Sequence, residues 1–126
     1  MTLTYEEADK RESPFGTPVS VISWAFTSNG SGVASEETVP VSGIPKRAVT
    51  VPDGVAPPTA GWDLTIKDED GVDVLCGNGV DRDSGGTGVV EQVFPCPGTV
   101  AVHSQLTFAV SNAGASKKAI VRLYIA

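Results

Sequence analysis

The chain has a single histidine, His103, and most acid–base or metal chemistry in a short chain would need it. A Ser–His–Asp triad requires a nucleophilic serine, yet the chain has no Gly-x-Ser-x-Gly turn to present one. His103 follows Val102 and precedes Ser104, and we interpret it as an ordinary turn residue. One histidine with scattered carboxylates is also a poor zinc site. We therefore expect no catalytic residue, no cofactor and no metal.

The acidic run Asp68-Glu69-Asp70-Gly71-Val72-Asp73 is the second place where chemistry is conceivable, because calcium loops are built from such carboxylates. It has only the second half of the EF-hand pattern and lies between expected strands. We interpret it as a solvated hairpin turn in which Gly71 supplies the positive φ. The alternative is a loop calcium site completed by Asp81 or Asp83.

Cys76 and Cys96 match no zinc or redox spacing. In a reducing compartment they would be two buried free thiols that behave as small hydrophobic residues. A disulfide is the alternative, if the two residues lie on neighbouring strands. The tryptophans, Trp24 and Trp62, lie in strand-like patterns and are expected in the core, although an exposed pair would stack on a sugar.

The charge balance argues against two classes of partner. Lys plus Arg is 9 and Asp plus Glu is 15, which gives a net charge of −6. The basic pairs 46–47 and 117–118 are isolated, so we expect no binding to nucleic acid or to an anionic membrane. The first residues lack the basic and apolar regions of a secretory signal, so we expect synthesis in a cytoplasm.

Period-two patterns predict an all-β chain with eight or nine short strands. The clearest is a hairpin in which residues 62–67 and 72–77 flank the turn at 68–71. Because such spacing is typical of sandwiches, we expect a two-sheet antiparallel β-sandwich, jelly-roll-like, over residues 17–126. The other expected strands are 19–26, 37–42, 47–51, 89–94, 99–102, 106–110 and 119–125.

Residues 1–16 are expected to form a charged N-terminal arm, because they lack a periodic apolar face. One helical turn over residues 4–12, capped by Thr4, is the alternative. An extended arm adds a strand to the exposed sheet edge of a partner through main-chain hydrogen bonds. Its candidate partner-binding residues are Tyr5, Glu6, Glu7, Lys10, Arg11 and Phe15.

The segments 61–75, 106–114 and 119–125 resemble the small virion structural proteins of tailed bacteriophages. There, a hairpin of the form Trp-Asp-x-Thr-apolar-x-Asp-x-(Asp/Asn)-Gly-apolar-Asp-apolar-Leu precedes a Leu-Thr-x-x-Val-x-Asn-Ala-Gly strand and a terminal apolar strand. The similarity covers roughly residues 40–126. It implies a capsid decoration protein, a dimer or trimer on the capsid exterior that binds across major capsid protein subunits. No functional residue is carried over from the family.

Two other functions fit the same features. One is a tail, neck or adaptor protein of the virion, or the attachment base of a fibre. The other is a glycan-binding, host-recognition module that uses Trp24 or Trp62. Enzymatic activity is not expected, because no nucleophile, acid–base pair or cofactor motif stands out.

Overall fold

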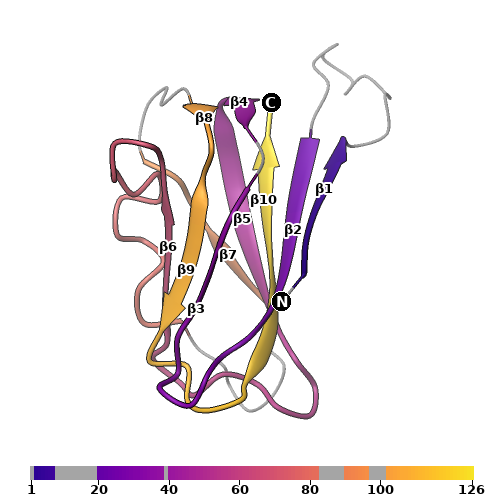
Figure 1. Ribbon diagram of the computed structural model, residues 1–126, viewed down its shortest axis with the longest axis vertical. Coiled ribbons are helices and arrows are strands. Elements are labelled where there is room, and N and C mark those ends of the chain that lie inside the picture. The colour runs from indigo at the N-terminus through magenta and orange to yellow at the C-terminus, as the bar shows by residue number, and fades with distance from the viewer. Residues whose placement is uncertain (1, 8–19, 39, 83–89, 97–101) are drawn as a thin grey trace.

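The computed structural model describes residues 2–7, 20–38, 40–82, 90–96 and 102–126, and the regular structure in them is β-strand (Figure 1). No helix in these ranges is long and apolar enough to cross a membrane. The strands are β1 (Thr2–Glu7), β2 (Ser20–Thr27), β3 (Ala34–Glu37), β4 (Val41–Gly43), β5 (Pro45–Pro52), β6 (Asp63–Lys67), β7 (Glu91–Val93), β8 (Val102–Ser104), β9 (Thr107–Ser111) and β10 (Lys118–Ile125).

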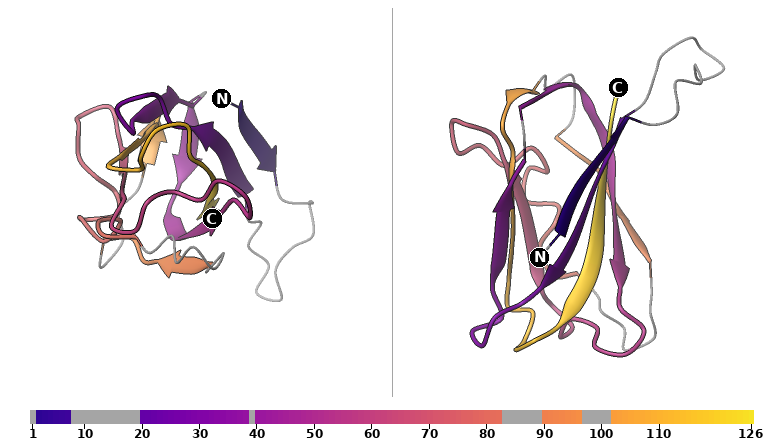
Figure 2. Two further views of the ribbon diagram at one scale, coloured as in Figure 1. Left: turned by 90° about the horizontal axis from the view of Figure 1, so that it is seen from below. Right: turned by 45° about the vertical axis from the view of Figure 1, so that its right-hand side comes forward.

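The strands form two layers packed face to face (Figures 1 and 2). One sheet has the order β1-β2-β10-β5-β7 and the other has the order β3-β9-β6, while β4 and β8 pair separately. All these pairs are antiparallel. From β2 onward, with β4 and β8 set aside, successive strands alternate between the layers. The arrangement of β2-β10-β5-β7 over β3-β9-β6 is a jelly-roll order. The predicted fold class is confirmed, with one strand missing from the smaller sheet.

Alternating side chains fill the space between the layers. In β10, Ala119, Val121, Leu123 and Ile125 are buried, and the residues between them face outward. Four buried aromatic rings run through this core in the order Trp62, Phe26, Trp24, Phe108, with centroids 5.7, 5.0 and 5.8 Å apart. Both tryptophans are fully buried, as predicted, so neither can stack on a sugar at the surface.

The second strand of the predicted hairpin is absent. The turn at 68–71 forms, with Gly71 at φ 80°, but after the single bridge Lys67↔Asp73 the chain enters turns. Of the apolar face predicted for this strand, Val74 is buried, while Val72 and Cys76 are exposed. Positive φ values at Cys76 (51°) and Gly77 (76°) end any extended run there. Residues 72–82 are therefore a loop, and the prediction of a strand at 72–77 was wrong.

The structure also corrects the predictions for the segment 37–42 and for His103. The strand expected over 37–42 is divided into β3 and β4, which belong to different sheets. His103 is an exposed residue of β8, paired with Ser42 of β4, rather than a turn residue. Much of the strand expected over 99–102 lies outside the described residues, as does Asp83.

Candidate assembly edges

The strand β1 forms one border of the larger sheet (Figure 2). It runs antiparallel to β2, with Tyr5 opposite Ile22, Glu6 opposite Val21 and Glu7 opposite Ser20. Within the described ranges β1 pairs with β2 alone, so its other side offers main-chain groups to a further strand. Three of the predicted partner-binding residues thus lie in this edge strand. The other three, Lys10, Arg11 and Phe15, lie outside the described residues.

At the opposite border of the sandwich, β7 ends the larger sheet and β6 ends the smaller one. There the loop 72–82 covers the outer side of β6. Main-chain hydrogen bonds join it to that strand: Val74 N–H donates to the carbonyl of Ile66 (2.8 Å), and Leu64 N–H donates to the carbonyl of Gly79 (2.8 Å). Arg82 N–H donates to the carbonyl of Trp62 (2.6 Å). The loop therefore occupies the place of the missing fourth jelly-roll strand and satisfies the edge that this strand would have paired.

A disulfide between Cys76 and Cys96 fastens this loop to the segment that follows β7. The free-thiol interpretation was therefore wrong. The bond does not join neighbouring strands, because Cys76 lies in a turn and Cys96 follows the end of β7. Cys96 N–H donates to the carbonyl of Val74 (3.0 Å), and the Asn78 side-chain amide donates to the carbonyl of Phe94 (3.0 Å). The loop is thus joined to both sheets.

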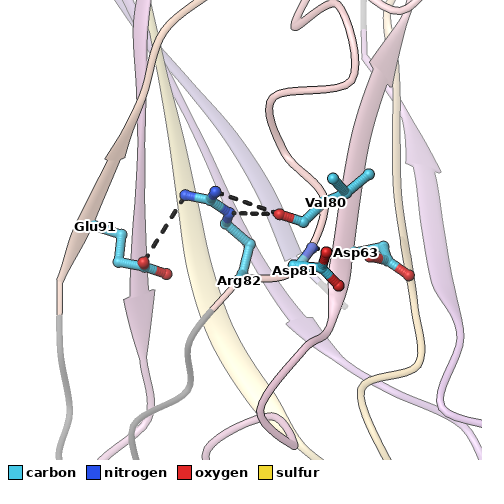
Figure 3. Close-up of polar contacts among 5 residues, drawn as sticks. All are labelled: Asp63, Val80, Asp81, Arg82 and Glu91. Carbon is cyan, nitrogen blue, oxygen red and sulfur yellow. Dashed lines mark hydrogen bonds and ion pairs between the residues drawn. The ribbon is translucent and has the colours of Figure 1, made fainter.

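Polar contacts at the end of the loop reinforce this closure (Figure 3). The Arg82 guanidinium donates to the carbonyl of Val80 and lies 3.9 Å from the carboxylate of Glu91 in β7. Asp81 N–H donates to the carboxylate of Asp63 in β6 (3.0 Å). The partly exposed ion pair contributes little free energy by itself, so the covalent bond and the main-chain hydrogen bonds dominate.

The aspartates that suggested calcium accept main-chain hydrogen bonds instead. Asp73 accepts from the N–H groups of Ile66, Leu75 and Gly77, and Asp68 accepts from those of Asp70 and Val72. The described residues contain no group of three or more potential metal-binding side chains. These carboxylates shape the turns, which is the usual role of aspartate in such segments.

Gly79 is a position where the loop leaves no room for a side chain against β6. A Cβ atom added there would overlap the carbonyl oxygen of Leu64, which is backbone and has little room to move. We expect Gly79→Ala to lower the free energy of unfolding by about 1–3 kcal/mol through this overpacking. Gly54→Ala is the matched control, because a Cβ at Gly54 meets nothing within 4 Å. Equilibrium urea unfolding measures both, and equal values would contradict the close approach.

The carboxyl group of Asp53 has a pKa below its ordinary value. Its carboxylate accepts hydrogen bonds from Ala56 N–H (2.8 Å) and Val55 N–H (3.0 Å), and these lower its pKa from the ordinary 3.8. Partial desolvation opposes this shift in pKa, and Lys118 adds to it. Asp53 also borders an open groove of about 420 Å³ on the outer side of β2, β10 and β5.

No model of a known protein family matches the chain, and no curated protein matches it. Among solved structures, it is similar to one described as the crystal structure of FLHE. That alignment covers 85% of this chain and 96% of the other, with 12% identity and a TM-score of 0.41. A likeness this distant assigns neither a family nor a function.

Proposed function

We propose that the chain is a non-enzymatic structural protein of a bacteriophage virion, of the capsid decoration type. It binds across major capsid subunits on the outside of the head, associates with copies of itself, and stabilises the shell. The resemblance of residues 40–126 to small virion proteins supports this proposal, as does the jelly-roll-like sandwich.

The observation that carries the proposal is the difference between the two borders of the sandwich. The border formed by β6 and β7 is closed by the loop 72–82 and the disulfide. At the other border, β1 pairs with β2 alone and β3 pairs with β9 alone among the described strands. An unpaired strand edge is a template for strand addition, which joins subunits without a deep pocket. In a repeated lattice many such modest contacts add up.

The disulfide supports an extracytoplasmic site of action. Reducing compartments keep thiols reduced, whereas disulfides persist on virion and cell surfaces. A protein made in the host cytoplasm and carried on the capsid exterior would form this bond after release. A rigid, oxidised sandwich would then hold its shape under the conditions that a free particle meets.

Copy number in purified particles tests the proposal. Quantitative mass spectrometry is expected to find on the order of hundreds of copies per particle, because a decoration protein follows the repeated shell lattice. A count in the teens or fewer would contradict capsid decoration and favour a tail, neck or fibre-base part. Absence from the particle would reject the virion assignment altogether.

Deleting residues 1–16 tests the arm and its edge strand. We expect the remaining chain to fold, because β1 is an outer strand that pairs with β2 alone among the described strands. Binding to particles that lack the protein is expected to weaken by about tenfold or more, since a full ladder of main-chain bonds is lost. Lys67→Ala, on the exposed end of β6, is the control and should bind normally. A truncated chain that fails to fold, or that binds unchanged, contradicts this role for β1.

A further inference from the structure

The outer face of the larger sheet combines apolar side chains with three cations. Its central strands β2, β10 and β5 turn one row of side chains inward and the other row outward. Cross-strand pairing places the outward rows side by side, with Ile120 between Ala25 and Val51, and Tyr124 between Val21 and Arg47. We call this the basic face; its residues are Val21, Ser23, Ala25, Thr27, Arg47, Val49, Val51, Lys118, Ile120, Arg122 and Tyr124.

Two of the three cations of the basic face, Arg47 and Arg122, have no carboxylate partner among the described residues, while Lys118 lies near Asp53. The strands β2, β5 and β10 contain no Asp or Glu. Arg47 lies 4.5 Å from the centre of the Tyr124 ring and donates to the Gln92 side chain (3.3 Å), and Arg122 stands opposite Val49 in the middle of the sheet. Neither arginine forms an ion pair within the described ranges.

The acidic residues nearest this face belong to its border elements. In the edge strand β1, Glu6 is paired with Val21 and Glu7 with Ser20, and in the edge strand β7 Glu91 faces Arg82. Asp53 follows β5 near Lys118, and one of its oxygens, Oδ2, accepts the N–H groups of Val55 and Ala56. The centre of the face is therefore apolar and positively charged on a chain whose net charge is −6.

The complementary charge lies on the other layer of the same molecule. Glu37 at the end of β3, with Asp68 and Glu69 of the turn after β6, lines an open hollow of about 480 Å³. Glu37 and Glu69 are exposed, and neither forms an ion pair in the described part of the chain. His103 also lines this hollow. We call this surface the acidic hollow.

We propose that the basic face docks the acidic hollow of a second copy of this chain. Two basic faces placed together would oppose cation to cation, so a symmetric face-to-face dimer is disfavoured. Basic face against acidic hollow pairs unlike charges, while the apolar rows of the face provide area to bury. Such a contact is head-to-tail, and it leads to rings or extended assemblies. This contact does not involve the β1 edge, so the test of the contact is independent of the test of the virion assignment.

Charge reversal on each surface, followed by mixing, tests the proposal. The wild type is expected to self-associate in low salt by sedimentation velocity, and the association should weaken as salt screens the charges. The variant R47E/R122E and the variant E37K/E69K should each associate about tenfold or more weakly. An equimolar mixture of the two should associate again, because each brings the surface that the other lacks. The single variant Ser31→Glu adds a negative charge at an exposed turn outside both surfaces and should leave association intact.

Several outcomes would overturn the proposal. They are a wild type that stays monomeric at its highest soluble concentration in low salt, a mixture that fails to recover, and a Ser31→Glu variant that weakens association equally. Capture of a short DNA duplex by the wild type in place of self-association would also reject a second copy as the occupant. Circular dichroism checks that each variant is folded. If R47E/R122E is not, Lys118→Glu reverses a more exposed charge on the same face.

Discussion

Replacing Trp62 with alanine is expected to lower the free energy of unfolding by about 3–5 kcal/mol, the range for removing a large buried aromatic side chain. Trp62 is fully buried, and its ring centroid lies 5.7 Å from that of Phe26 in the opposite sheet. It therefore ends the row of four rings that joins the two layers. Domains of this size have a total stability of about 5–15 kcal/mol, so the loss would be a large share of it.

The variant Trp62→Phe separates the loss of volume from the loss of the indole. The indole N–H has no hydrogen-bond partner in the described part of the chain, so phenylalanine removes an unpaired buried donor while keeping an aromatic ring. We expect its cost to be clearly smaller than that of alanine. Urea unfolding followed by far-ultraviolet circular dichroism measures both. A change below about 0.5 kcal/mol for Trp62→Ala would be typical of a surface site and would contradict the packing described here.

The strands with one buried face could be predicted from alternation alone. The ranges 47–51, 106–110 and 119–125 correspond to Pro45–Pro52, Thr107–Ser111 and Lys118–Ile125. Each of these strands is packed against the opposite sheet on one side, and a shift of one residue would expose its apolar row. The period-two pattern therefore predicted both where these strands form and which of their side chains face the core.

The alternation at Val72, Val74 and Cys76 misled the same reasoning. Here a side chain competes with the strand: the Asp73 carboxylate accepts three main-chain N–H groups and winds the segment into turns. The disulfide to Cys96 then fixes the loop in place. The three N–H groups lie within seven residues of Asp73, but Cys96 is 20 residues from Cys76, and alternation of apolar residues reports neither the carboxylate's hydrogen bonds nor the disulfide.

The basic face could not be predicted from the sequence, for a related reason. Arg47 and Arg122 are far apart along the chain and belong to no basic cluster, so composition alone indicated only an acidic protein. Pairing of β5 with β10 places Arg47 opposite Tyr124 and Val49 opposite Arg122, which brings the two cations to one surface. Such a surface depends on strand order, which alternation does not determine.

The double variant Cys76→Ser/Cys96→Ser is expected to lower the free energy of unfolding by about 3 kcal/mol, the chain-entropy value for a bond between residues 20 apart. The loss should be greater than that of a typical surface substitution, because the unfolded chain regains the freedom of the whole intervening loop. Guanidinium unfolding with and without dithiothreitol measures it. Reduction should bring the wild type close to the variant and should leave the variant unchanged. Equal stability of the oxidised wild type and the variant would contradict the prediction.

Amide hydrogen exchange should show which part of the chain the Cys76–Cys96 disulfide stabilises. The amides of Val74, Leu64 and Arg82 join the loop 72–82 to β6, so in the variant they are expected to lose protection first. Amides in the central pair β2 and β10 should open only with global unfolding, because those strands are paired along their full length. If instead all amides lose protection together, the loop is not a separate unit. Loop-first opening would mean that the disulfide holds in place the segment that substitutes for the missing strand and thereby keeps this border of the sandwich closed.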